Sequence, residues 1–389
     1  MKYKFEDIAI NSTAKKLPEP IDNEHYIGLE HLDSGNLYVT RWGAETAPIG
    51  EKLLMKKGDV LFGKRRAYQK KVAIAPFDGI FSAHGMVLRP KEDVICKEFF
   101  PFFISSDYFL NEAIRISVGG LSPTINWKDL RVLEFELPSL EEQKVLADKL
   151  WAAYEVKESY KDLLAQTDKL LHAQFEKMFG DGSPQLKIKD TLQESFSGEW
   201  GKEDSDNSGV KVLRTTNFTN NGILDYSNII TRIIDEDKLN KKKLLRGDII
   251  LERSGGTSDN PVGRVVYFDA EGVYLCNNFT QVLRSNESVN SKYLFYNLYY
   301  YYQDNKSEVR SMGSQTTGIQ NLSLTKYYEV EIPVPPMKKQ LEFVSIAEQA
   351  EQTKASLNKG IEAIEAVIRS LIAEGTTKVL CEWRESGAR

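Results

Sequence analysis

Two long tracts of the 389-residue chain repeat apolar residues at three- and four-residue intervals, the spacing of one face of an α-helix. The first tract predicts a helix over 140–179. Ser139 and Glu142 form a capping box at its start, and Gly180 follows its end. The second tract predicts a helix over 337–374. A helix of about 40 residues is about 60 Å long, which exceeds what a domain of roughly 140 residues can cover.

The apolar stripes of the two tracts predict that the helices pair with each other. Leu163 and Leu170 widen the first stripe, whose main positions are Leu146, Leu150, Ala153, Tyr160, Leu164 and Leu171. The second stripe has the sustained spacing of a coiled coil, at Phe343, Ile346, Ala350, Thr353, Leu357, Gly360, Ile364, Val367 and Leu371. The alternative is that each helix packs its stripe on its own domain. The matched lengths and stripes favour an antiparallel pair with one globular domain at each end.

The segments that precede the two tracts resemble each other, which indicates an internal duplication. Residues 87–138 align without gaps on 282–333, so that "VLRPKEDVICKEFF" falls on "VLRSNESVNSKYLF". "KGDVLF" at 57–62 matches "RGDIIL" at 246–251, and Gly35 faces Gly222 at a slightly smaller offset. The identities at an offset of 195 include Arg89/Arg284, Arg115/Arg310, Asn126/Asn321, Glu134/Glu329, Glu136/Glu331 and Pro138/Pro333.

Each half therefore predicts a mixed domain of short strands and short helices, followed by a return strand and a long helix. "KVAIAPFDGIFSAHG" and "RVVYFDAEGVYLCNN" predict hairpins with turns at Asp78-Gly79 and Glu271-Gly272. "LYYYYQ" at 298–303 is interpreted as the buried and half-buried face of a small helix rather than a platform for stacking bases. The predicted class is α+β, with pseudo-two-fold symmetry and the divisions 1–138, 139–180, 181–335, 336–375 and 376–389.

This order of elements resembles the specificity subunit of a Type I restriction-modification enzyme. The residues that carry the resemblance are "LPSLEEQ" at 137–143 and "VPPMKKQ" at 334–340, two helix starts similar to P-x-L-x-E-Q. The second departs from the usual acidic pair by carrying Lys338-Lys339. "GDVLF", "GDIIL" and "GSQTTGIQNLSL" also fit, and the resemblance extends to about Gly375. It implies a bipartite DNA target, with one half read by each domain and the helices holding the halves at a fixed separation.

The resemblance also implies partners. They are double-stranded DNA, two methyltransferase subunits docked on the helices, and restriction subunits. The methyl donor and ATP belong to those partner subunits, so this chain is expected to be non-catalytic and to hold no cofactor. Glu142, Gln143 and Gln340, at the helix starts, are the expected partner contacts.

Four loops are candidates for DNA contact, because base readout and phosphate binding both require Arg, Lys, amide and hydroxyl side chains. "GKRRAYQKK" at 63–71 is the strongest, and "ERSGGTSDNPVGR" at 252–264 is its counterpart, whose glycines allow the backbone to approach phosphate. "GGLSPTIN" at 119–126 and "GSQTTG" at 313–318 come second. The alternative for the basic run is a solvated turn. The predicted DNA-binding residues are Lys64, Arg65, Arg66, Tyr68, Lys70, Lys71, Ser122, Asn126, Arg253, Ser254, Thr257, Arg264, Gln315, Thr316 and Thr317.

Composition narrows these expectations. The chain has 51 basic and 56 acidic residues, so its net charge of −5 requires any DNA contact to be made by local patches. No apolar run has the length of a membrane span, and the N-terminus lacks the apolar core of a signal peptide. Cys96, Cys276 and Cys381 have neither disulfide nor metal-ligand spacing, so a cytoplasmic protein without a metal site is expected.

Catalytic motifs do not emerge from the sequence. "DNPVG" at 259–263 lacks the second proline and the aromatic residue of a methyltransferase site, there is no P-loop, and the four histidines are isolated in sequence. Two alternatives stay open: a coiled-coil scaffold whose end domains bind proteins, and a self-contained DNA-modifying enzyme. A gel shift in the presence of a methyltransferase subunit distinguishes the scaffold from a DNA-recognition subunit, because only the latter binds DNA sequence-specifically. A methyl-donor binding assay on the isolated chain tests the DNA-modifying enzyme.

Overall fold

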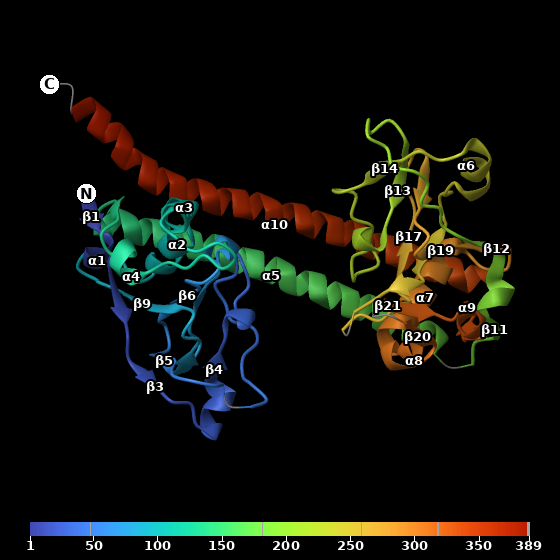
Figure 1. Cartoon of the computed structure of the whole chain (residues 1–389), viewed down its shortest axis with the longest axis horizontal. Helices are drawn as coiled ribbons and strands as arrows, with labels where there is room; N and C mark the ends of the chain where they lie inside the picture. The colour runs from blue at the N-terminus through green and yellow to red at the C-terminus, as the bar shows by residue number, and fades with distance from the viewer. Residues whose placement is uncertain (47, 181, 258, 317–318, 387–389) are drawn as a thin grey trace. The chain divides into compact units, whose positions relative to one another are not determined.

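The computed structural model describes residues 1–46, 48–180, 182–257, 259–316 and 319–386, with side chains except at 315, 316 and from 375 onward. The chain divides into two compact units. Unit 1 comprises Met1–Leu163 with Leu357–Arg389, and unit 2 comprises Leu164–Ser356. Each unit contains one globular domain and part of both long helices, α5 (Leu140–Phe179) and α10 (Met337–Ser386) (Figure 1). The boundary between the two units therefore falls within both long helices and not at their ends.

The first domain, which precedes α5, is built on two four-stranded sheets. Leu61, Phe81 and Val87 belong to the core cluster that these sheets share. In order across the first sheet, the strands are β2 (Ala9–Ser12), β9 (Met86–Pro90), β6 (Val60–Phe62) and β7 (Val72–Ile74). In the second they are β3 (Lys15–Lys16), β5 (Lys52–Met55), β8 (Gly79–Phe81) and β4 (Tyr26–Ile27).

Short helices cover the first sheet, and a two-stranded ribbon closes the domain. Phe5, Phe103, Phe109 and Phe135 are fully buried or nearly so, and their ring contacts join these elements into one core. The ribbon is β1 (Lys2–Lys4) with β10 (Glu134–Glu136). The helices are α1 (Phe5–Ile8), η1 (Pro20–His25), η2 (Leu29–His31), η3 (Ala67–Gln69), α2 (Phe100–Ser105), α3 (Asp107–Arg115) and α4 (Trp127–Leu130).

The second domain, between α5 and α10, repeats this architecture and adds one small sheet. Its four-stranded sheet has the order β12 (Leu192–Ser197), β19 (Thr280–Ser285), β15 (Ile249–Glu252) and β17 (Val265–Tyr267). The other sheets are β14 (Ile230–Arg232), β13 (Val210–Leu213) and β18 (Tyr274–Cys276); β16 (Ser254–Gly255), β21 (Ile319–Leu322) and β20 (Gly313–Thr316); and β11 (Gln185–Lys187) with β22 (Glu331–Pro333). The helices are η4 (Ile188–Thr191), η5 (Thr215–Asn217), α6 (Glu236–Lys242), α7 (Ser291–Asp304), α8 (Lys306–Ser311) and α9 (Leu324–Tyr328).

Strand register confirms the duplication and corrects part of the alignment. Leu61 pairs with Val87, and Ile250 pairs with Val282, so the offset of 195 holds for β9 and β19. The return strands β10 and β22 and the helix starts at Leu140 and Met337 instead correspond at an offset of 197. The extra two residues lie in the segment of the second domain that contains the β20–β21 hairpin. The matches Asn126/Asn321, Glu134/Glu329, Glu136/Glu331 and Pro138/Pro333 are therefore wrong by two positions.

The two predicted hairpins are also wrong. β7 pairs with β6 and β8 pairs with β5, so the chain crosses from one sheet to the other at the Asp78-Gly79 turn. In the second domain, β17 and β18 likewise belong to different sheets. These strands are apolar on both faces, and Val72 and Ala73 enter different core clusters. Such strands fit the interior of a two-sheet stack better than an isolated hairpin.

A buried ion pair explains why both halves contain a Gly-Asp pair and a distant arginine. The guanidinium of Arg89 contacts both carboxylate oxygens of Asp59 at 2.7 and 2.8 Å, and that of Arg284 contacts Asp248 at 2.8 and 2.9 Å. Each aspartate also accepts a backbone N–H three residues earlier, which closes a turn. The preceding residues, Gly58 and Gly247, have φ values of +89° and +97°, the left-handed region that favours glycine.

The tyrosine-rich segment forms α7, as predicted. Tyr293, Tyr296, Tyr300 and Tyr302 are buried. Burial raises the pKa of Tyr302 to about 12. These rings contribute to the core of the second domain and are not available for stacking on bases.

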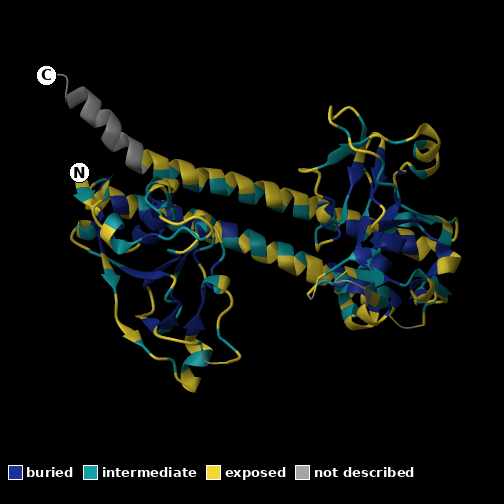
Figure 2. Cartoon of the chain, in the orientation of Figure 1, coloured by how far each residue is buried: buried dark blue, intermediate teal, exposed yellow. Residues whose placement is uncertain are grey.

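The helix α5 spans the predicted residues, and the six main positions of the predicted stripe are buried or half-buried, but the helix is not buried along its whole length. Ala147, Leu150 and Tyr154 are buried near one end, and Leu171, Phe175 and Phe179 near the other. Leu163 and Leu170, expected within the stripe, are 46% and 71% exposed, and residues 158–170 include no buried position (Figure 2). Each end of the helix therefore packs on a globular domain.

The helix α10 begins at Met337 as predicted and continues past Glu374 to Ser386. Gly375 lies inside it, and one glycine inside a helix costs only about 1 kcal/mol. Thr353 and Val367, placed in the predicted stripe, are exposed, and the less exposed positions are Lys354 and Ile368. The other predicted positions, from Phe343 to Leu371, are buried or half-buried, so the stripe lies where it was predicted except at Thr353 and Val367.

Within each unit, α5 and α10 contact each other. In unit 2, Lys354 Nζ lies 2.6 Å from Asp168 Oδ1, and the rings of Phe175 and Phe343 lie 5.2 Å apart, which places the two segments antiparallel. In unit 1, a Cβ added to Gly360 would lie 2.5 Å from the Tyr160 ring, so a small residue is required there. The class is α+β. Among the described residues, no helix combines the length and apolarity needed to cross a bilayer.

Candidate DNA-contact surface

The two candidate loops of the first domain form one surface. Arg65 pairs with Thr124 in an antiparallel bridge, the Arg66 N–H donates to Pro123 O at 2.7 Å, and the Ile125 N–H donates to Lys64 O at 3.0 Å. Loops 63–71 and 119–126 are thus joined through their backbones. Sequence spacing gave no reason to expect this contact, since the loops are about 50 residues apart.

The side chains on this surface are available to a ligand. Arg65, Arg66 and Tyr68 are exposed. Arg65 Nη1 lies 3.3 Å from His84 Nε2, and Arg66 Nε donates to Ser122 Oγ at 3.4 Å. Arg66 has a φ of +54°, which is rare for a residue with a side chain and holds the tip of the loop in a specific conformation. Asn126 is half-buried and donates to Asp129.

Basic groups gather around these arginines. Burial, and then Lys15, lowers the pKa of Lys64. Burial, followed by Arg65, Lys64 and Lys52, lowers the pKa of His84, which favours the neutral imidazole, the form that can accept a hydrogen bond from Arg65. Lys15 and Lys52 were missed by sequence reasoning because they lie on β3 and β5, outside any basic run. Lys15 lies 3.7 Å from Glu51, and Lys52 is buried and donates to the carbonyls of Ile49 and Gly50, so both already have partners within the domain.

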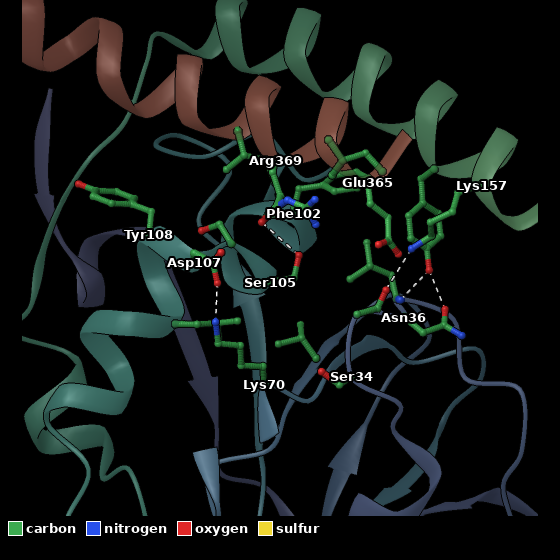
Figure 3. A pocket seen from close by; sticks show the side chains of 18 of the residues that line it. Ser34, Asn36, Lys70, Phe102, Ser105, Asp107, Tyr108, Lys157, Glu365 and Arg369 are labelled. Carbon is green, nitrogen blue, oxygen red and sulfur yellow. Dashed lines mark hydrogen bonds and ion pairs between the residues drawn. The ribbon is translucent and has the colours of Figure 1, made fainter. Parts of the chain in front are cut away.

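Two lysines of the basic run face away from this patch. Lys71 Nζ donates to Leu29 O at 2.6 Å. Lys70 Nζ lies 2.5 Å from Asp107 Oδ1, at the edge of a cavity of about 480 Å³ within unit 1 (Figure 3). In the same cavity, Lys157 Nζ donates to Gly35 O, and its pKa is lowered by burial. Lys70 and Lys71 thus have partners within the domain.

The corresponding loops of the second domain also meet. Ser254 pairs with Asn321 across β16 and β21, and the Leu322 N–H donates to Arg253 O at 2.8 Å. Both halves therefore bring a loop after the central strand against the loop before the last short helix. Ser254 is buried and donates to Asn321 Oδ1 at 2.7 Å, whereas Thr257 is exposed and Arg253 is half-buried.

The Arg264 side chain bonds to other residues of the second domain. Its guanidinium forms an ion pair with Glu252, at 2.7 Å from Nε, and that carboxylate side chain is 2% exposed. Arg264 also donates to the carbonyls of Phe218 and Thr215. The hydrogen bond and charge of Glu252 raise the pKa of Arg264. Arg264 therefore joins neighbouring segments of the domain instead of projecting from the loop.

Three predicted residues of the β20–β21 loop have no described side chain. The side chains of Gln315 and Thr316 are outside the described set, and Thr317 lies outside the described residues altogether.

The two glutamines at the helix starts bind their own domains. Gln143 is fully buried: its amide oxygen accepts the Cys96 N–H, and its amide nitrogen donates to Val94 O and Pro138 O. This arrangement does not present the side chain to a partner, which corrects the expected partner contact at Gln143.

Gln340 is bound in the same way, which also corrects the partner contact expected at Gln340. It too is fully buried, accepting the Asn290 N–H and donating to Ser288 O and Pro335 O. Glu142 is exposed and forms the predicted capping box with Ser139.

The fold and these paired surfaces agree with the sequence comparisons. The chain matches the Type I restriction modification DNA specificity domain family twice, over residues 14–166 and 188–366, and it belongs to this family. It is 22% identical over 346 residues to the Type I restriction enzyme StySPI specificity subunit of Salmonella potsdam, covering 79% of this chain and 71% of that protein. It is 21% identical over 334 residues to the EcoKI specificity subunit of Escherichia coli (strain K12), with the same coverage.

Solved structures share the fold. A chain from a study of complex assembly and conformational transition of the type I R-M system aligns with a TM-score of 0.56 and 16% identity, covering 97% of both chains. The S subunit of a Type-I restriction-modification system from M. genitalium aligns with a TM-score of 0.54 and 13% identity, covering 97% of this chain and 96% of that one. Both support the predicted fold class, two mixed domains with long helices.

Proposed function

We propose that this chain is the DNA-recognition subunit of a Type I restriction-modification complex, and that each domain reads one half of a bipartite target. The observation that carries the proposal is the duplicated surface. In each half, two loops distant in sequence are joined through backbone hydrogen bonds beside the four-stranded sheet. Two equivalent readers in one chain fit a target of two half-sites.

In this proposal the chain recognises DNA and does not itself catalyse methyl transfer or cleavage. Methyltransferase and restriction subunits supply the methyl donor, ATP and reactive groups, and the helices provide the docking platform. Gln143 and Gln340 hold the helix starts to the domains, so partner contacts fall to exposed residues of the same turns, such as Glu142. The relatives named as specificity subunits support this assignment.

Replacing Arg65 and Arg66 with alanine is expected to weaken recognition of one half-site only. Removing an arginine that donates two hydrogen bonds to a base reduces discrimination by roughly 1–3 kcal/mol. The measurement is a gel shift with the methyltransferase subunit on DNA in which either half-site is scrambled. Arg131→Ala removes an exposed arginine outside both loops and serves as the control. Equal losses on every sequence would make the two arginines phosphate anchors, and no loss would make the loop a solvated turn.

Lengthening both helices by seven residues is expected to lengthen the spacer between the half-sites. Insertions between Leu163 and Leu164 and between Ser356 and Leu357 fall at the boundaries of the two units, so the contacts within each unit stay intact. Seven residues add about 10 Å of helix, which is about three base pairs at about 3.4 Å per step. Methylome sequencing of cells carrying the variant with its methyltransferase partner measures the spacer. An unchanged spacer in an active variant would show that the helices are a docking platform and not a ruler.

A further inference from the structure

A histidine and two carboxylates converge within unit 2, on α5 and α7 and not on the loops assigned to DNA. His172 and Glu176 lie one turn apart on α5, and Asp304 is the last residue of α7. His172 Nε2 is 3.0 Å from Asp304 Oδ2 and 4.0 Å from Glu176 Oε1, and one ligand atom from each residue lies within 4.8 Å of the other two. Because 132 positions separate His172 from Asp304, the histidine looks isolated in the sequence.

The electrostatics of this cluster favour a cation. Asp304 ends α7, and Glu176 lies in the last turn of α5. The C-terminal end of a helix carries the negative end of its dipole, so a carboxylate there is unfavourable without a positive partner. Lys177 supplies one positive charge in the same turn of α5. A cation bound between the two carboxylates would add positive charge at both helix ends.

The geometry suits a metal ion bound by one nitrogen and two oxygens. Zinc lies about 2.0–2.2 Å from such atoms, so tetrahedral ligand atoms are about 3.3 Å apart. The observed 3.0 and 4.0 Å bracket this value, and the Glu176 side chain, 66% exposed, has room to close the longer gap. The His172 ring stacks on Tyr300 at 4.3 Å and 9°, which fixes the direction of Nε2. A cavity of about 200 Å³ is bordered by His172, Glu176, Asp304 and Tyr300.

We propose that His172, Glu176 and Asp304 bind a divalent transition-metal ion of the zinc class. An imidazole ligand selects zinc, cobalt or nickel over magnesium and calcium, which prefer oxygen alone. The bound ion links the end of α5 to the end of α7 and so fastens the helix to the second domain. This site is independent of the proposed DNA-recognition function, and failure of either leaves the other intact.

Titration with Co²⁺ tests the site. The full chain, without a polyhistidine tag and stripped with a chelator, is expected to bind one Co²⁺ with visible absorption bands that Zn²⁺ abolishes. His172→Ala is expected to lose the bands, and Glu176→Gln to weaken binding at least about tenfold. His25→Ala and Glu155→Gln, both at exposed positions, serve as controls and keep wild-type binding.

Circular dichroism of the metal-free variants separates loss of the site from loss of the fold. Because Glu176 is largely exposed, Glu176→Gln is expected to stay folded even if His172→Ala does not. Wild-type Co²⁺ binding by a folded His172→Ala or Glu176→Gln variant overturns the proposal. So does the absence of cobalt bands in the wild-type chain, which would leave the cluster as a hydrogen-bonded ion pair.

Discussion

Replacing Asp248 with alanine is expected to destabilise the second domain by about 3 kcal/mol. The substitution leaves the guanidinium of Arg284, 20% exposed, without its main partner, and removes the acceptor for the Leu245 N–H. Breaking a buried ion pair by removing one partner typically costs about 3–5 kcal/mol. We expect a loss at the lower end of this range, because Arg284 retains its ion pair with the more exposed Glu194 at 2.7 Å. Urea denaturation of the purified chain measures the loss.

Asp269→Ala is the matched control, because it removes an exposed aspartate from the same domain and is expected to change stability by less than about 0.5 kcal/mol. Asp59→Ala tests the equivalent pair in the first domain, where Arg89 is 35% exposed. A loss at Asp248 no larger than at Asp269 would contradict a structural role for the Gly-Asp motif.

Replacing Gln340 with alanine is expected to cost about 3 kcal/mol and to loosen the start of α10. The variant loses the acceptor for the Asn290 N–H and the donor to Ser288 O and Pro335 O. A buried polar group left without a partner costs about 1–3 kcal/mol, and water entering the site offsets part of the total. Hydrogen exchange measures the effect, with faster exchange expected at the Asn290 amide.

Gln349→Ala is the control, since it removes an exposed glutamine from the same helix. Gln143→Ala is expected to give an equivalent loss in unit 1, with faster exchange at the Cys96 amide. If the Asn290 amide keeps its wild-type protection in Gln340→Ala, the glutamine does not hold the helix start to the domain.

The duplication and the long helices were predictable from sequence because their signals are local and repeated. The capping box at Ser139 and the start at Met337 fixed the helix starts, and both halves carry the same blocks in the same order. The two-residue shift before Asn126 was not predictable, since a gapless alignment still finds identities such as Glu134/Glu329. Strand pairing resolves it because β10 and β22 have defined partners.

The site was only partly predictable, because a residue's type does not reveal its partner. Arg65 and Arg264 both lie in loops that contain glycine and arginine, yet one is exposed and the other bonds to buried Glu252. The glutamines at the helix starts fit a family motif, and their burial shows that the motif serves the fold. Lys15 and Lys52, on separate strands, help to lower the pKa values of Lys64 and His84, which no linear charge count detects.

Methylome sequencing of cells that express this chain with its methyltransferase partner tests the central claim most directly. The duplicated surfaces predict one methylated motif made of two specific half-sites separated by a non-specific spacer of fixed length. In the Arg65→Ala, Arg66→Ala double variant, one half-site is expected to relax while the other and the spacer are retained. A contiguous motif, or methylation without sequence preference from an active complex, would contradict recognition by two separate domains.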